Sequence, residues 1–180
     1  KGELTEEDKQ NLVVKTMNDI KPPKLVDKYK LSDLRISDDI SKESINTYAM
    51  GMKFVFVDNK APSRSETEIF GVLMESLKRK DDKNTELSVK VLGQYSILNK
   101  QRAEAILSPI IPESLSKDHL EVVNGFNNIS LALEDMATAK TDLIKAMMGQ
   151  KLYGEQMTRV YRAMSDMQEI FNKYEITVFK

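Results

Sequence analysis

A long apolar repeat near the carboxyl end is the feature that most constrains how this chain can fold. Apolar side chains recur there at steps of four, three, four, three, four and three residues. The repeat consists of Tyr153, Met157, Val160, Met164, Met167, Phe171 and Tyr174. A period of about 3.5 residues places them along one face of an α-helix, as in the seams of antiparallel bundles. The repeat therefore predicts a long last helix, from a cap at Thr141 to about residue 174.

Five further segments have a helical period, and cap or turn residues separate them. The first four are expected at roughly residues 6–20, 41–58, 65–78 and 85–107. The fifth follows a stiff corner at residues 108–112, with Pro112 in its first turn or in a short turn that leads into it. The apolar period runs through Asn124-Gly125, so we expect this helix to be continuous. Residues 54–57 favour strands, which leaves a short strand there as an alternative.

Length and composition agree with a single helical domain. The chain has 180 residues, of which 41% are hydrophobic, with seven glycines and five prolines. Domains hold about 100–200 residues, so one domain is expected. We predict an all-α fold, an antiparallel helical bundle of four longer helices with one or two accessory helices. Residues 1–5 are expected to form a flexible N-terminal tether, and residues 21–40 a long connection that lies against the bundle.

Glycines inside the predicted helices need an explanation, because each costs roughly 1 kcal/mol relative to alanine. They are Gly51, Gly71, Gly93, Gly125, Gly149 and Gly154. The absence of a side chain lets two helix backbones approach closely, so we expect these glycines at helix crossings. A hinge or a ligand contact near Gly149 and Gly154, or helix ends that the pattern does not reveal, are the alternatives.

The composition excludes several kinds of chemistry. Without cysteine there is no disulfide, thiolate zinc site, iron–sulfur cluster or cysteine nucleophile, and one histidine excludes every site that needs two imidazoles. The sequence also lacks a phosphate-binding glycine loop, a Gly-x-Ser-x-Gly motif and a His-Glu-x-x-His motif. We therefore expect no enzyme activity, no cofactor and no metal site.

Charge and hydropathy limit the class of partner. The 27 basic and 28 acidic residues alternate along the chain, so no positive surface is expected to attract nucleic acid. No apolar stretch reaches the roughly 18 residues that a transmembrane helix needs. The charged start at Lys1 would suit a solvated tether, with a membrane anchor upstream or a leader that has been removed. A protein partner or self-association is the expected mode of action.

Four residues are candidates for contact with a ligand or partner: His119, Asn124, Met157 and Met164. His119 lies among carboxylates at the start of the fifth helix, where we expect it to bond a cap or a neighbouring helix; haem or metal ligation is the alternative. Asn124, with Asn127 and Asn128, interrupts an apolar face and is expected to fix helix register, or else to bind a polar ligand. At heptad spacing the two methionines are expected in the core, or in an adaptable partner groove if exposed.

Ile110-Ile111-Pro112, His119-Leu120, Val123-Asn124, Asp142 and Tyr153 together resemble the pattern of uncharacterised helical domains in predicted secreted or lipid-anchored bacterial proteins. The resemblance covers the C-terminal part of the chain. It implies an extracytoplasmic location, periplasmic or at the cell surface, with the cytoplasm as the alternative.

These features predict a noncatalytic structural or interaction protein that acts through its helical surface or by self-association. The resemblance implies that this protein is exported. The alternative is a small-molecule or cofactor-binding helical bundle. In that alternative His119, Asn124 and the methionine face would line a pocket.

Overall fold

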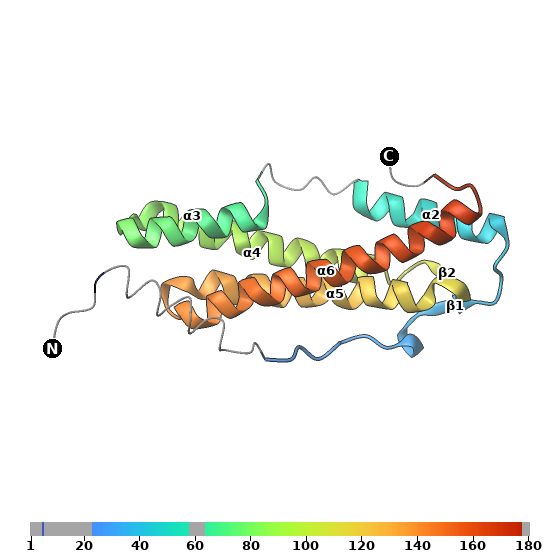
Figure 1. Cartoon of the computed structure of the whole chain (residues 1–180), viewed down its shortest axis with the longest axis horizontal. Helices are drawn as coiled ribbons and strands as arrows, with labels where there is room; N and C mark the ends of the chain where they lie inside the picture. The colour runs from blue at the N-terminus through green and yellow to red at the C-terminus, as the bar shows by residue number, and fades with distance from the viewer. Residues whose placement is uncertain (1–4, 6–22, 58–63, 178–180) are drawn as a thin grey trace.

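The computed structural model describes residue 5, residues 23–57 and residues 64–177. These parts of the chain contain five α-helices and one small sheet (Figure 1). The helices are α2 (Lys42–Val57), α3 (Glu66–Arg79), α4 (Asp82–Ala105), α5 (Ser116–Met136) and α6 (Leu143–Lys173). The fold is the all-α helical bundle that the sequence predicted. The helix expected at residues 6–20 lies outside the described residues, as does the tether at 1–5 apart from Thr5.

Consecutive helices form the body of the bundle. α3 packs on α4, α4 on α5, and α5 on α6, and the chain reverses direction at each step (Figure 1). α2 lies at the end where α4 finishes and α5 begins, next to the carboxyl end of α6 (Figure 1). The bundle is therefore elongated, and α2 packs beside the other helices at one end of it.

Side-chain caps set where the helices begin. Ser65 and Glu68 form a reciprocal capping box at α3, in which each side chain accepts from the other's backbone N–H. Asp81 caps α4, which starts three residues earlier than predicted. The predicted Thr141 cap of α6 is wrong by one residue. The carboxylate of Asp142 accepts from the Lys145 N–H at 2.9 Å, while Thr141 follows the 3-10 turn η3 (Ala137–Lys140).

A two-stranded parallel sheet was not expected from the sequence. β1 (Arg35–Ser37) pairs with β2 (Ile110–Pro112), with Ile36 beside Ile111. Pro112 ends β2 and is followed by the 3-10 turn η2 (Glu113–Leu115), so it belongs to the approach to α5 and not to the helix itself. The strand considered at residues 54–57 is wrong, because those residues complete α2.

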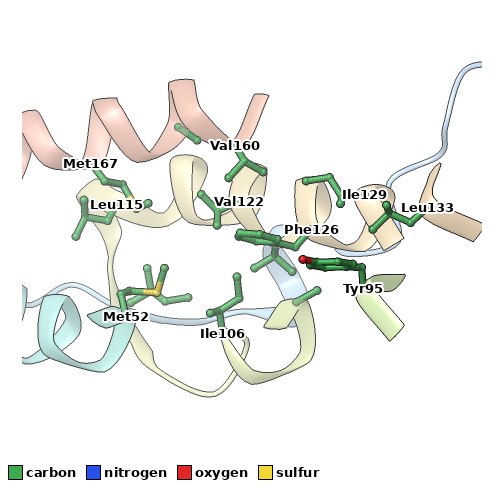
Figure 2. Packing of buried hydrophobic residues seen from close by; sticks show 14 of the residues in the cluster. Met52, Tyr95, Ile106, Leu115, Val122, Phe126, Ile129, Leu133, Val160 and Met167 are labelled. Atoms are coloured by element: carbon green, nitrogen blue, oxygen red, sulfur yellow. The ribbon is translucent and has the colours of Figure 1, made fainter. Parts of the chain in front are cut away.

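The core is centred on α5. Every residue from Val122 to Ser130 is buried, and the helix continues through Asn124-Gly125 as predicted. Figure 2 shows Val160 and Met167 of α6 pointing toward one side of α5, with Met52 and Ile106 on the other side. α5 is thus covered by neighbours around its circumference from Val122 to Ser130, whereas Lys117 and Glu134 near its two ends are exposed.

The apolar repeat of α6 faces this core only in part. Val160, Met167 and Phe171 are buried. Tyr153, Met157, Met164 and Tyr174 are half-buried and pack against the edge of the core. Smaller residues share the buried face: Ala146, Gly149, Leu152 and Ala163. A straight helix drifts by about 20° per heptad against a 3.5-residue repeat, so the seam and the contact face separate along the 31 residues of α6.

Two of the helical glycines lie where helices approach closely. An added Cβ at Gly149 would lie 2.7 Å from the Ala132 carbonyl oxygen, and one at Gly125 would lie 2.3 Å from Val160 Cγ2. The predicted helix crossing is therefore confirmed for Gly125 and Gly149. It is wrong for Gly71, Gly93 and Gly154, which have no such neighbour within 4 Å.

Substitution of two glycines on α6 tests this close approach. Gly149→Ala should lower the free energy of unfolding by about 1–3 kcal/mol, because the new methyl meets backbone atoms of α5. Gly154→Ala, in the same helix but in open space, should raise it by about 0.5–1 kcal/mol through helix propensity. Urea unfolding of both variants measures the difference. Equal effects would contradict the tight α5–α6 contact.

Candidate functional site

α5 carries polar side chains in a position where water cannot reach them. The buried ones are Ser116, His119, Asn124, Asn127, Asn128 and Ser130. A buried polar group is costly unless it is hydrogen-bonded, so each of these side chains needs a partner inside the protein. Their partners show which parts of the chain the polar residues hold together.

Asn124 holds an extended segment that lies alongside the bundle. We call residues 23–37 the strap; it runs along α5, contains the turn η1 (Leu31–Asp33) and ends with β1 (Figure 1). The Tyr29 N–H donates to Asn124 Oδ1 at 2.9 Å, and Asn124 Nδ2 donates to the Tyr29 carbonyl oxygen at 3.0 Å. This pair of bonds is the one that a neighbouring β-strand would make. It recognises the main chain of the strap and not a side chain.

A charged cluster beside Asn124 fixes the strap to α6. The guanidinium of Arg159 donates two bonds to the carboxylate of Asp27, at 2.7 and 2.8 Å, and a third from Nε to Glu121 of α5. Asn128 adds a bond to Asp27 Oδ1 at 3.1 Å. Because the Arg159 side chain is only 21% exposed, these pairs are partly shielded from water.

The charges of this cluster stabilise one another. Hydrogen bonding to Arg159, opposed in part by burial, lowers the pKa of Asp27. The same bond to Asp27, again opposed by burial, raises the pKa of Arg159. Asp27 and Arg159 therefore stay ionised across the physiological range, and the strap is held by a permanent ion pair.

Two hollows flank the Arg159 cluster. One lies beside the strap and is lined by Lys24, Leu25 and Asp27 together with Asn128 and Gln156, among others. The other lies along α6 and is lined mainly by charged residues: Asp118, Glu121, Arg159, Arg162 and Asp166. Burial, together with the nearby carboxylates Asp166 and Glu121, raises the pKa of Asp118.

His119 is engaged in the core. It is fully buried, and its Nδ1 lies 2.7 Å from the Tyr48 hydroxyl of α2. The same hydroxyl lies 3.3 Å from Met167 Sδ of α6, so this contact joins three helices. Burial lowers the pKa of His119 to about 4, against a smaller opposing effect of the Ile106 backbone. His119 is therefore a neutral structural residue at physiological pH.

The four predicted contact residues are not brought together. His119 reaches Tyr48, whereas Asn124, about 140° away around the axis of α5, reaches the strap. Met157 and Met164 are half-buried on α6. None of the four lines either hollow beside Arg159.

Sequence reasoning missed Asp27 and Arg159, which anchor the strap. Asp27 looked like one polar residue of a connection, and Arg159 like a solvated neighbour of the α6 repeat. Their positions are 132 residues apart, so no local pattern linked them. An arginine beside a heptad seam was the available signal, and it is a common one on helix surfaces.

The described residues show neither a clustered metal site nor a membrane-spanning helix. Within them, no group of three or more histidine or acidic side chains is arranged to hold a metal ion. The described helices include none with the length and low charge needed to cross a membrane.

The burial of His119 predicts a pH-dependent stability. Its pKa is lower in the folded chain than in the unfolded chain, so the unfolded state binds the proton first as the pH falls. From pH 8 to pH 5 the free energy of unfolding should fall by about 2 kcal/mol from this group. Urea unfolding of wild type and His119→Gln isolates it, because the carboxylates common to both cancel in the difference. If the difference in free energy of unfolding between wild type and His119→Gln is the same at pH 8 and pH 5, His119 is not a buried neutral histidine.

Removal of the Asn124 amide tests how the strap is held. Asn124→Ala should lower the free energy of unfolding by about 1–3 kcal/mol, because it leaves the Tyr29 backbone groups without a partner. Hydrogen exchange at the Tyr29 amide should accelerate in the same variant. Asn46→Ala, at an exposed position of α2, is the matched control and should change neither measurement. Unchanged exchange at Tyr29 would show that Asn124 does not hold the strap.

Comparisons with protein-family models, with curated proteins and with solved structures found no match to this chain. The strap, the Arg159 cluster and the exposed surfaces are therefore interpreted from their own contacts.

Proposed function

We propose that this chain is a noncatalytic interaction protein that acts through its helical surface, by self-association or by binding a protein partner, outside the cytoplasm. One observation carries the proposal. Large apolar side chains are exposed on elements that meet at a single end of the bundle, where α2 and the small sheet lie (Figure 1).

We call these side chains the end surface; they are Ile36, Ile40, Met50, Phe54 and Ile110. Met50 and Phe54 lie one turn apart on α2 and are 52% and 70% exposed. α2 packs against the chain that precedes β2, since an added Cβ at Gly51 would lie 4.0 Å from Pro109. Exposed apolar groups from adjoining elements are typical of protein interaction sites.

The polar residues support the noncatalytic part of the proposal. His119 is enclosed in the core with Tyr48, and Asn124 is occupied by the strap. Arg159 is shared between Asp27 and Glu121. A general base or nucleophile must reach a substrate, and these groups are committed to holding the chain together. The extracytoplasmic location rests on the resemblance of the C-terminal part to domains of secreted or lipid-anchored proteins.

A surface double variant tests the proposal. If the end surface associates, wild type should form concentration-dependent oligomers in sedimentation equilibrium, and Met50→Ser with Phe54→Ser should weaken them by about tenfold or more. Leu87→Ser is the matched control, because Leu87 is 55% exposed near the start of α4, far from the end where α2 lies. At concentrations low enough for wild type to be monomeric, all three proteins should have nearly the same melting temperature, since the changed side chains are exposed.

A partner in place of a second copy gives a different result. Wild type would then stay monomeric, and chemical cross-linking in the native extract would attach a protein to the end surface of wild type but not of the double variant. A monomer without any such adduct contradicts the proposal.

A second candidate, a small-molecule-binding bundle, is favoured by the hollow beside the strap. Its lining includes the amides of Asn128 and Gln156 and the cation of Lys151, which suit a polar ligand. Native mass spectrometry of the freshly purified chain would reveal such a ligand as mass above that of the polypeptide. The hollow does not include His119, Asn124 or the α6 methionines, so this site would differ from the pocket that the sequence led us to expect.

A further inference from the structure

The strap lies on the bundle in the way that a bound peptide lies in a groove. Asn124 pairs with both backbone groups of Tyr29, and β1 pairs in parallel with β2. Both contacts recognise an extended main chain. One side chain adds specificity, since the Asp27 carboxylate is bound by Arg159 and Asn128. These are the elements by which proteins recognise extended peptides: main-chain pairing and a few anchored side chains.

The side chains of the strap contribute little to the core. Leu34 is the one buried side chain between residues 23 and 37, while Leu25 and Tyr29 are half-buried. Val26 is 84% exposed. The strap is therefore attached mainly by polar contacts. Any chain with the same sequence and an extended backbone makes those contacts equally well.

The groove, in contrast, requires an occupant. Asn124 and Asn128 on its floor are each 1% exposed, and their described bonds to the strap come from Tyr29 and Asp27. Buried amides left without a partner are costly. An extended peptide with an aspartate two residues before the paired backbone position satisfies them.

We propose that this groove is a peptide-binding site that accepts the strap of a second copy of the chain, so that two molecules exchange straps. A second copy carries the same strap sequence, which already fits the groove within one molecule. Every contact of the exchanged pair is a contact already present within one molecule, which makes exchange of an element a low-cost route to dimers. The inference rests on the proposed function and gives self-association a specific mechanism.

The connection after the strap permits the exchange. Residues 38–41 join β1 to α2, and all four are exposed. When extended, four residues span up to about 14 Å. A change of direction in these residues carries the strap away from its own groove, while α2 keeps its packing on the bundle.

Cysteine pairing tests the exchange without background, because the chain has no cysteine of its own. Arg35 and Ile110 are direct partners in the sheet and both are exposed. Neighbouring strands lie about 4.8 Å apart, within the Cα separation of a disulfide. Arg35→Cys and Ile110→Cys are introduced into separate full-length chains, which are mixed at high concentration and oxidised with oxidised glutathione. Strap exchange predicts a disulfide-linked heterodimer.

The control measures random collision. Thr158→Cys, at an exposed position of α6, is mixed with Ile110→Cys under the same conditions. The yield of disulfide-linked heterodimer from the sheet pair, Arg35→Cys with Ile110→Cys, should exceed the yield from the control pair by about tenfold. Strand pairing holds the two sulfurs of the sheet pair at a high effective concentration. The yield from the sheet pair should also exceed the yield of disulfide-linked homodimer from either variant alone. Equal yields for the sheet pair and the control pair overturn the proposal.

A chain carrying both Arg35→Cys and Ile110→Cys provides the second readout. Oxidised at high dilution, it locks its strap in its own groove and should sediment as a monomer, and reduction should restore the dimer. A locked chain that still dimerises like wild type overturns strap exchange. If that dimer responds to Met50→Ser with Phe54→Ser, the proposed function stands without the exchange. If wild type remains monomeric and makes no partner adduct at the end surface, both fail.

Discussion

The burial of the middle of α5 on all sides, from Val122 to Ser130, is the constraint on which the rest of the structure depends. A helix in this position can carry polar residues only if other elements bring partners to them. Tyr48 brings α2 to His119, and Tyr29 brings the strap to Asn124. The Ser96 hydroxyl of α4 donates to the Ser130 hydroxyl oxygen at 3.5 Å. The polar residues of α5 thus determine where its neighbours lie, whereas its apolar residues supply the bulk of the buried surface.

The contact between α5 and α6 depends on both close packing and charge. Gly125 and Gly149 let the two helices approach more closely than any residue with a side chain at these positions would allow. Beside this close helix contact, Arg159 of α6 forms ion pairs with Glu121 of α5 and Asp27 of the strap. The glycines set the distance between α5 and α6, and at this distance the Arg159 side chain reaches two carboxylates. Packing and electrostatics therefore support the same arrangement.

Features encoded locally could be predicted from the sequence, and features encoded by distant pairs could not. The period of α6 and the continuity of α5 through Asn124-Gly125 depend on residues within a few turns. The choice of Asp142 over Thr141 as cap depends on which oxygen reaches the Lys145 N–H, which a sequence pattern does not determine. Three-residue strands are too short to show a period, so β1 and β2 were missed.

The candidate site shows the same division. Asn124 was recognisable as a polar residue on an apolar face, but its partner Tyr29 lies 95 residues away. Asp27 and Arg159 are 132 residues apart, so no local pattern pairs them. The cluster also explains why a strap held by charge can leave its groove. Arg159 lies between two carboxylates, and without Asp27 it keeps Glu121. Departure of the strap therefore leaves a neutral ion pair on the bundle and not an isolated buried cation, which would be far more costly.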